Sequence, residues 1–429
     1  MNNIINYKQK LQNEYNLKIF TDNIEYECLE QIELLLQQDM FKDCKIRIMP
    51  DCHSGKGCVI GFTANLEDKV IPNIVGVDIG CGLYCVSLGK ISLNFQWLDE
   101  GIRKEVPSGR ESFNEIRTKF KKIQELICYR ELKNHKEFER QIGTLGGGNH
   151  FIEVDIDSSG NKYLVIHSGS RNLGNQVANY YQNLAIKLHS GYDEYFEEKE
   201  QLIKYYKEHG MKNKIQDELR KLNTKYNNKK CNMPKDLCYL EGKYKEDYLH
   251  DMKICQEYAV LNRYTMAKNI INKVINPMIM NELDIDKIEK FETIHNYLNF
   301  EDNIIRKGAV SAKKDEKLII PINMRDGSLI CIGKGNEDWN NSAPHGAGRI
   351  MSRSKAKQLV DMEEYKQSMK EIYTTSVSES TIDEAPMVYK PLEEIESNIK
   401  DTVDIVERIK PRPYPRRLCY EGNVHSTRV

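Results

Sequence analysis

Short apolar segments with the character of β-strands recur through the first third of the chain. Residues 45–49 (K-I-R-I-M) alternate between polar and apolar side chains, which predicts a half-buried strand. Residues 58–64 and 70–77 are largely apolar and predict two further strands, separated by a charged turn. Residues 110–141 are charged and predict helix, whereas residues 163–167 (Y-L-V-I-H) predict a strand that ends in a Gly-rich loop.

A helical pattern begins in the middle of the chain. From about residue 176 to residue 290 the composition shifts toward Lys, Glu, Tyr and Asn, with few glycines. This predicts a helical insertion with a loop near residues 223–234, and its charged side chains are expected on a solvated face.

Strands and Gly-rich loops return over residues 291–349, and a charged segment predicts a helix over residues 352–373. Prolines predict an extended tail over about residues 410–429. The expected fold class is therefore α/β in the mixed (α+β) sense. We expect one domain over residues 1–429, with the helical insertion inside it.

The near balance of charge narrows the classes of function. Lys and Arg number 63 and Asp and Glu number 64, which gives a net charge of −1. A protein held to nucleic acid by its overall charge is clearly basic, so any such contact must come from a local patch. Pro72, Asn73 and Asp78 interrupt the most apolar stretch, which argues against a membrane span. The polar residues 1–20 and the 12 cysteines, none in a C-x-x-C pair, predict a cytoplasmic protein with mostly reduced thiols.

Candidate metal ligands lie in short segments rich in Gly, Asn and Ser. Taken singly, each has an ordinary structural explanation, such as a core histidine or a strand-end carboxylate. Taken together, one carboxylate, one thiolate and three imidazoles suit one or two divalent transition metals, and either Mn²⁺ or Zn²⁺ fits this mixed set. The candidates are Asp78, Cys81, His150, His167 and His295.

A further histidine stands in a loop suited to phosphate chemistry. His345 lies in the segment S-A-P-H-G-A-G-R, and a neutral imidazole can attack a phosphoryl centre. Glycines at 146–148 would let backbone N–H groups approach phosphate oxygens. The chain has no G-x-x-x-x-G-K-[ST] and no G-x-G-x-x-G motif. Met324 occupies the position of the nucleophilic lysine in a K-x-D-G-like stretch, which excludes lysine nucleotidyl transfer there.

These segments, in this order, resemble the RtcB family of GTP-dependent, Mn²⁺-dependent RNA ligases, and the resemblance covers nearly the whole chain. The matching segments are residues 49–53 (M-P-D-C-H), 77–82 (V-D-I-G-C-G), 145–153 (L-G-G-G-N-H-F-I-E), 167–171 (H-S-G-S-R), 295–297 (H-N-Y), 306–312 (R-K-G-A-V-S-A), 345–349 (H-G-A-G-R) and 386–390 (P-M-V-Y-K).

The resemblance implies the RtcB-type fold, with mixed and antiparallel sheets around a central metal pocket. It implies that the five candidate ligands hold two Mn²⁺ ions, with Zn²⁺ as the rival occupant, that Cys81 bridges them, and that His345 becomes covalently linked to GMP from GTP. The implied guanylate-site residues are Asn149, His150, Phe151, Ile152, Glu153, His295, Asn296, Pro321, Ile322, Asn323, Met324, Ser328, Gly346, Ala347, Gly348 and Tyr389.

The implied substrate is RNA with a 2′,3′-cyclic phosphate or 3′-phosphate end and a 5′-hydroxyl end. A basic rim that the net charge hides is expected from Lys56, Arg171, Arg306, Lys307, Arg349 and Arg353. Two readings from other classes stay open at this point. One is a metal-dependent phosphoesterase or nuclease without guanylylation, and the other is a non-enzymatic RNA-binding factor. The sequence leaves open the physiological RNA, an activating protein and the oligomeric state.

Three segments depart from the family pattern. The usual I-P-G-S-M-G reads I-P-I-N-M-R at residues 320–325, so two glycines beside the nucleotide are replaced. The usual D-V-H-L-G-K-G reads D-C-H-S-G-K-G at residues 51–57. The family often ends in Lys-Gly, whose lysine reads the guanine, whereas this chain continues through K-P-R-P-Y-P-R-R to Val429.

Overall fold

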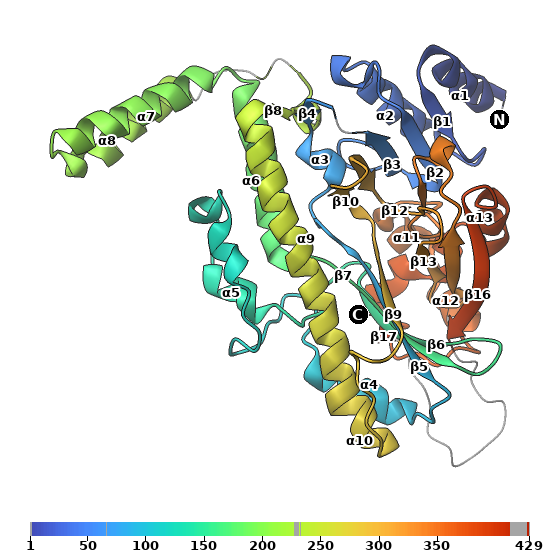
Figure 1. Cartoon of the computed structure of the whole chain (residues 1–429). Helices are drawn as coiled ribbons and strands as arrows, with labels where there is room; N and C mark the ends of the chain where they lie inside the picture. The colour runs from blue at the N-terminus through green and yellow to red at the C-terminus, as the bar shows by residue number, and fades with distance from the viewer. Residues whose placement is uncertain (1, 66, 227–230, 232, 412–426, 429) are drawn as a thin grey trace.

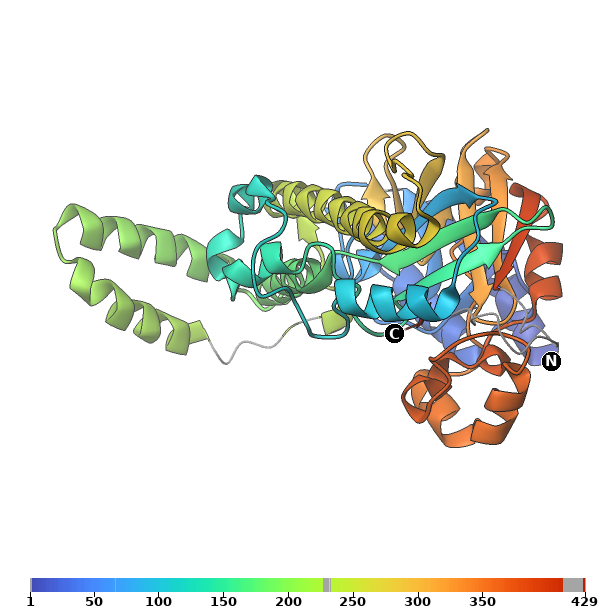
Figure 2. The same cartoon turned by 90° about the horizontal axis from the view of Figure 1, so that it is seen from below.

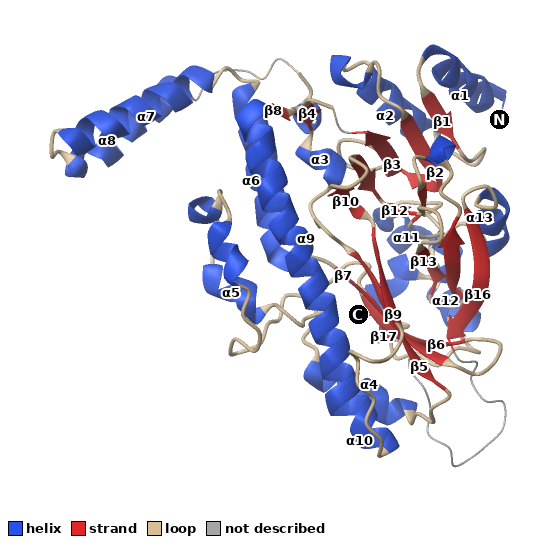
Figure 3. Cartoon of the chain, in the orientation of Figure 1, coloured by secondary structure: helices blue, strands red, loops and turns tan. Residues whose placement is uncertain are grey.

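Strands and long helices occupy different sides of the structure, a computed structural model that describes residues 2–65, 67–226, 231, 233–411 and 427–428 (Figure 1). Most strands lie in the right half of Figure 3, and the longest helices lie to their left. The mixed α/β class predicted from the sequence is confirmed, and the strands form several separate sheets.

The largest sheet has the strand order β13-β14-β16-β6-β7-β5-β9, with β17 paired beside β6. All of its strand pairs are antiparallel. The backbone N–H of Ile319 in β13 donates to Thr293 Oγ1 in β9 at 3.1 Å, so the two ends of the sheet approach each other and the sheet curls. Its strands are β5 (Gly82–Gly89), β6 (Phe151–Ile156), β7 (Lys162–Ser168), β9 (Lys290–Ile294), β13 (Lys317–Asn323), β14 (Gly327–Gly333), β16 (Val403–Pro411) and β17 (Thr427–Arg428).

The central strands contribute side chains to two cores, because successive side chains of a strand point to opposite faces of the sheet. Leu83 and Cys85 of β5 pack with Val165 of β7 in the core inside the curled sheet. Val86 belongs instead to the core that contains buried residues of helices α4 (Phe95–Glu105) and α9 (Gly242–Ile270). The long α9 therefore covers the outer face of the strands that lead to the site.

A second, five-stranded sheet has the order β1-β2-β3-β11-β10. The β1–β2 pair is parallel and the remaining pairs are antiparallel. Two small two-stranded sheets, β4–β8 and β12–β15, complete the strand structure. These strands are β1 (Leu17–Ile19), β2 (Ile46–His53), β3 (Ile60–Asn65), β4 (Lys69–Val70), β8 (Leu240–Glu241), β10 (Asn296–Asn299), β11 (Ile304–Lys307), β12 (Ala309–Ser311) and β15 (Ser342–Pro344).

Among the described residues of the middle of the chain, five α-helices follow one another, and two of them form a hairpin that projects from the body (Figure 2). They are α6 (Arg171–Leu188), α7 (Asp193–Glu208), α8 (Ile215–Tyr226), α9 (Gly242–Ile270) and α10 (Asn276–Ile279). The other helices are α1 (Asn2–Glu14), α2 (Tyr26–Leu36), α3 (Pro72–Val75), α5 (His135–Arg140), α11 (Arg353–Leu359), α12 (Met362–Ser368) and α13 (Leu392–Asn398). Among the helices of the described residues, none combines the length and apolar character that a bilayer crossing requires.

The strand predicted over residues 70–77 is wrong beyond its first residue. Only Lys69–Val70 is extended, and Pro72–Val75 forms the short helix α3. Pro72 is the first residue of that helix, where its fixed φ suits a helical turn and its missing N–H costs nothing. Buried apolar residues cannot by themselves distinguish a strand from a short core helix.

The helix predicted over residues 110–141 is also wrong for most of its length, since only His135–Arg140 is α-helical. No residue between Phe113 and Ile123 is buried, so the apolar stripe that a long helix would need is interrupted there. The helix predicted over residues 352–373 is divided into α11 and α12. Asp361 begins the second helix by accepting hydrogen bonds from Glu363 N and Glu364 N at 2.9 Å.

Two further predictions fall partly on residues outside the described ranges. Helix α8 continues to Tyr226, and the rest of the predicted loop includes residues 227–230 and 232. The predicted extended tail begins at the end of β16, and residues 412–426 and 429 lie outside the description.

Candidate functional site

Strand register brings three of the predicted ligand segments to one edge of the large sheet. Gly82, at the start of β5, pairs with Ser168 at the end of β7 and with Ile294 at the end of β9. Cys81 comes just before this edge, and His295 follows Ile294. Antiparallel pairing therefore places Cys81, His167 and His295 side by side, although they are far apart in the sequence.

The fourth segment reaches the same edge through β6. Its first residue, Phe151, pairs with His167, so His150 lies next to the end of β7. Asp78 precedes β5 in a tight turn, where its Oδ1 accepts a hydrogen bond from Ser170 N at 3.0 Å. Each of the five residues that the sequence proposed as metal ligands therefore lies in contact with at least one other of the set.

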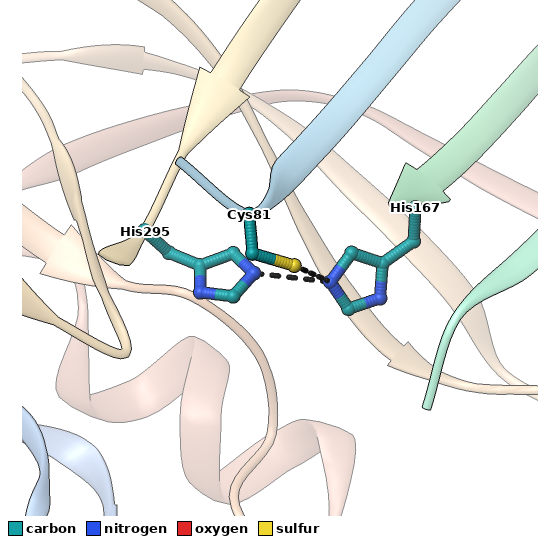
Figure 4. Close-up of side chains that lie close together, drawn as sticks. All are labelled: Cys81, His167 and His295. Carbon is teal, nitrogen blue, oxygen red and sulfur yellow. Dashed lines mark hydrogen bonds between the residues drawn. The ribbon is translucent and has the colours of Figure 1, made fainter. Parts of the chain in front are cut away.

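The ligand atoms converge around the sulfur of Cys81. Its Sγ lies 3.3 Å from His167 Nε2 and 3.5 Å from His150 Nε2. His167 Nε2 lies 3.0 Å from His295 Nε2, as Figure 4 shows for these side chains. His150 Nε2 lies 2.9 Å from Asp78 Oδ2.

These atoms form two candidate cation sites that share one residue. Cys81, His167 and His295 make up one group, and Asp78, Cys81 and His150 make up the other, with the ligand atoms of each group within 4.8 Å of one another. The Cys81 sulfur belongs to both groups, so it is available to one bound cation or to two.

The protonation of two histidines matches metal binding. His150 Nδ1 lies 2.9 Å from the carbonyl oxygen of Leu145, and His167 Nδ1 lies 3.1 Å from that of Asn149. A carbonyl oxygen only accepts hydrogen bonds, so each Nδ1 carries a proton. In a neutral ring, as at His167, Nε2 then presents a lone pair to the centre, whereas His150 Nε2 donates to Asp78 Oδ2 and gives up that proton when it binds a cation. This is how metal-ligating histidines are commonly oriented.

Distances also fit a bound divalent cation. Two nitrogens at about 2.05 Å from one tetrahedral cation lie about 3.4 Å apart, and a nitrogen and a sulfur lie about 3.6 Å apart. The Nε2–Nε2 and Sγ–Nε2 distances, 3.0 Å and 3.3 to 3.5 Å, are close to these values. The mixed O, N and S donors are unsuited to Ca²⁺ or Mg²⁺ and suit a transition metal.

Burial keeps most of these groups in their neutral forms. Burial lowers the pKa of His167 and of His295 well below 6.5, and the neighbouring imidazoles lower both further. Burial and the Asp78 carboxylate raise the pKa of the Cys81 thiol well above its usual value. Burial opposes ionisation of Asp78, but the hydrogen bond and charge of His150 outweigh it and lower the Asp78 pKa to about 2. Neutral imidazoles are ready to ligate, and a cation that binds Cys81 must displace its proton.

His345 lies beside this cluster and is held by a buried carboxylate. The rings of His295 and His345 have centroids 4.8 Å apart. Asp51, in β2, is fully buried, and its Oδ2 lies 2.7 Å from His345 Nδ1. The same oxygen accepts hydrogen bonds from the backbone N–H groups of His345 and Gly346, at 3.1 and 3.2 Å.

This contact fixes the tautomer of His345. A carboxylate oxygen accepts hydrogen bonds, so Nδ1 carries the proton and Nε2 keeps its lone pair for a ligand or an electrophile. Gly348 explains part of the fit: its φ is +74°, and a Cβ there would lie 2.2 Å from the carbonyl oxygen of Asp51. Asp51 belongs to a segment quoted above, but nothing in its spacing assigned it a role, so sequence reasoning missed this positioning residue.

A pocket opens beside His345 and contains about half of the predicted guanylate-site residues. His53 also lines it, and burial lowers the pKa of this imidazole to about 4. The predicted residues that line the pocket are Asn149, Phe151, Pro321, Ile322, His345, Gly346, Ala347, Gly348 and Tyr389.

The remaining predicted residues lie elsewhere. His150 and His295 belong to the ligand cluster, and Asn296 Oδ1 accepts a hydrogen bond from Gly308 N at 3.0 Å. Ile152 packs in the core shared with α9, and Met324 packs in a core with Tyr365. Three others, all buried, are Glu153, Ser328 and Asn323, whose Oδ1 accepts from the N–H groups of Arg325 and Asp326.

The predicted basic rim is only partly present. Arg349 and Arg353 line the pocket, and both form ion pairs with Glu384. Arg306 is fully buried in an ion pair with Asp302 at 2.8 Å, and Lys307 donates to the Cys58 carbonyl at 3.1 Å. The prediction that Arg306 and Lys307 belong to a basic rim is therefore wrong, because both are buried and stabilise the fold.

Helix α9 supplies support that the sequence did not indicate. Asn262 donates to the carbonyl oxygens of Thr144 and Gly169, at 3.2 and 3.1 Å. Arg263, fully buried, donates to the carbonyl oxygens of Gly80 and Ser168, at 2.7 and 2.6 Å. These two side chains hold the loops that carry the ligands. The available signal was an Asn-Arg pair at positions that continue the largely apolar face of this helix.

Comparisons with known proteins identify a family and several relatives. The sequence model of the family described as tRNA-splicing ligase RtcB matches residues 39–133 and 127–414. An RNA-splicing ligase RtcB from Escherichia coli K12 is 30% identical over 451 residues, covering 97% of this chain and all of the relative. A tRNA-splicing ligase RtcB from Archaeoglobus fulgidus is 26% identical and covers 84% of this chain and 83% of its own. A third relative of the same name, from Nanoarchaeum equitans, is 24% identical and covers 81% of this chain and 82% of its own.

Proposed function

Since the chain belongs to the RtcB family of tRNA-splicing ligases, we propose that it is an RNA ligase that uses GTP and two Mn²⁺ ions. It joins an RNA end with a 2′,3′-cyclic phosphate or 3′-phosphate to an end with a 5′-hydroxyl. The observation that carries this proposal is the contact of His345 with both Asp51 and the ligand cluster.

Asp78, Cys81, His150, His167 and His295 would hold the two cations, with Cys81 shared between them. Bound there, divalent cations offset the charge of phosphate groups and orient their oxygens. This separates the proposal from a non-enzymatic RNA-binding factor, which needs no ligand cluster.

His345 would act as the nucleophile. The Asp51 carboxylate accepts a hydrogen bond from the Nδ1–H group of His345, and the Nε2 lone pair attacks the α-phosphorus of GTP. A nitrogen–phosphorus bond forms, the bond to the β-phosphate oxygen breaks, and pyrophosphate leaves. Phe151, Tyr389 and Gly346, which line the pocket, would contact the guanylate.

Ligation would then follow in three steps. Water opens a 2′,3′-cyclic phosphate to a 3′-phosphate, and that phosphate attacks the phosphorus held by His345, which releases the histidine. The 5′-hydroxyl of the second strand attacks the activated 3′-phosphate, and GMP leaves. Arg349 and Arg353, at the pocket wall, are placed to meet phosphate groups, although Glu384 neutralises part of their charge.

The experiment is incubation with α-labelled GTP and Mn²⁺, followed by measurement of acid-labile label on the protein. We expect label on the wild type and on His209→Ala, a matched change at an exposed histidine of the helical hairpin, and none on His345→Ala. Label that persists on His345→Ala contradicts the nucleophile assignment. Release of phosphate from RNA ends without any labelled protein favours a metal-dependent phosphoesterase instead.

A further inference from the structure

A polar groove runs along helix α6, separate from the pocket at His345. It has a volume of about 620 Å³ and lies between α6, the segment 131–134 and the start of α7. In Figure 1, α6 leads from the end of β7 to the base of the α7–α8 hairpin, with α5 beside it. We refer to this feature as the α6 groove.

The floor of the α6 groove is a row of amide side chains. They recur every three or four residues, which places them on one face of the helix. Asn175 and Asn183 are exposed, and Gln176 binds both the N–H and the C=O of Lys133, at 2.7 and 3.1 Å, which fixes the opposite wall. The row consists of Asn172, Asn175, Gln176, Asn179 and Asn183.

The charge of the walls suits an anion. Lys133, Lys187 and Lys199 line the groove, and none of the three forms an ion pair with any residue that the structure describes. Glu131 is the acidic residue of the lining. The rest of the lining includes aromatic side chains such as Tyr180 and Tyr195, which are only half-buried. Amides, unpaired lysines and accessible aromatic rings together are typical of surfaces that bind RNA strands.

The groove begins close to the ligand cluster along the chain. Helix α6 begins at Arg171, directly after Ser170, whose N–H binds Asp78. Asn172, the next residue along α6, already lines the groove. Because α6 has 18 residues, the helix leads about 27 Å away from the ligand cluster.

We propose that the α6 groove binds the RNA strand that continues from the end being joined, and this rests on the ligase function proposed above. The lysines contact phosphates, the asparagines and Gln176 contact sugars and base edges, and the aromatic rings accept stacked bases. The groove thus sets affinity for longer RNA, while the His345 pocket acts on the end itself.

The test compares two RNAs with 3′-phosphate ends, a trinucleotide and a 20-nucleotide single strand. A trinucleotide at 3.4 Å per stacked base is about 10 Å long, too short to follow α6. The groove variant is Asn175→Asp/Asn179→Asp/Asn183→Asp, and its control is Asn3→Asp/Asn6→Asp/Asn13→Asp, with the same charge change on exposed positions of α1. We expect the groove variant to bind the 20-mer at least 10-fold more weakly and the trinucleotide as tightly as wild type.

A second variant removes charge without adding any: Lys133→Ala/Lys187→Ala/Lys199→Ala. Each phosphate contact on a single strand contributes about 0.7 to the slope of log affinity against log salt, so this slope should fall by about 2. The proposal is overturned if both groove variants bind the 20-mer as tightly as the α1 control does.

Labelling of His345 by GTP needs no RNA and separates this inference from the function it rests on. Groove variants should keep wild-type labelling. An unlabelled wild type refutes the guanylylation proposal, whereas weaker binding of the 20-mer by the groove variants still supports the RNA groove.

Discussion

Replacing Asp51 by asparagine tests how the carboxylate prepares His345 for nucleophilic attack. In the wild type, Asp51 Oδ2 accepts three hydrogen bonds, from His345 Nδ1, His345 N and Gly346 N. Its Oδ1 is buried and has no hydrogen-bond partner among the described residues. In Asp51→Asn, two backbone N–H groups therefore favour the amide oxygen at the Oδ2 position. The amide NH₂ then occupies the position that lacks a partner in the wild type as well.

The expected effect follows from this orientation. The oxygen still accepts from His345 Nδ1, so the tautomer is kept and only the negative charge is lost. A hydrogen bond to a charged group contributes about 1.5–3 kcal/mol and a neutral one about 0.5–1.5 kcal/mol, a difference of about 1.4 kcal/mol. This corresponds to a rate of guanylylation reduced about 10-fold. An amide turned the other way would present NH₂ to Nδ1 and force the proton onto Nε2. The rate of guanylylation would then fall about 10⁴-fold, as wrong tautomers lower the rate in catalytic triads.

The assay is single-turnover labelling from α-labelled GTP at saturating Mn²⁺, with metal content and thermal unfolding measured on the same samples. Asp22→Asn, at an exposed carboxylate, is the control. A rate within twofold of wild type would mean that Asp51 does not prepare His345. A 10⁴-fold loss with intact fold and metal content would refute the argument that the backbone N–H groups fix the amide.

Three further predictions concern the ligand cluster. Cys81→Ala should lose most of the bound metal, because both cation groups share the Cys81 sulfur. The control Cys85→Ala, at a buried cysteine four residues further on in β5, should keep its metal. Equal metal content of the two variants by mass spectrometry would contradict the shared role of Cys81. Gly169→Ala places a Cβ 2.2 Å from Asp78 Oδ1 and should lower metal retention, whereas Gly147→Ala, whose nearest neighbour would lie 3.7 Å away, should behave as wild type in the same measurement. Finally, the pKa values of His167 and His295 lie well below 6.5, so the unfolded chain takes up protons below about pH 6.5 that the folded protein does not. Metal-free protein should then lose up to about 1.4 kcal/mol of unfolding free energy per pH unit for each histidine, measured in urea from pH 7 to pH 5, and His295→Asn should lose less; stability that rises on acidification would contradict the burial of neutral rings.

The sequence predicted which residues meet at the site better than it predicted the elements that carry them. Asp78, Cys81, His167 and His295 stand at strand ends in short polar segments, and only their combination indicated a metal centre, because each one alone has an ordinary structural explanation. The strand register brings these distant residues together, because Gly82 pairs with both Ser168 and Ile294, and this pairing cannot be read from the spacing along the sequence. The cytoplasmic location and the division into one domain with an insertion stay predictions.

The errors have common physical causes. Pro72 and its apolar neighbours are buried, and burial alone does not choose between a strand and a turn of helix. Arg306 looked like a surface cation, but Asp302, four residues earlier, and the Ser342 hydroxyl satisfy it inside the protein. Asp51 could not be assigned because its partner His345 lies 294 residues away.

Helix α9 has a consequence for how this chain tolerates changes in length. Its 29 residues extend about 44 Å, and Asn262 and Arg263 in its last third tie it to the ligand loops, so an insertion or deletion earlier in α9 would rotate those two side chains by 100° per residue. The α7–α8 hairpin before it projects away from the sheets (Figure 2), and its turn at Gly210 is exposed. An affinity tag, a fluorophore or a whole fused protein therefore belongs at that turn.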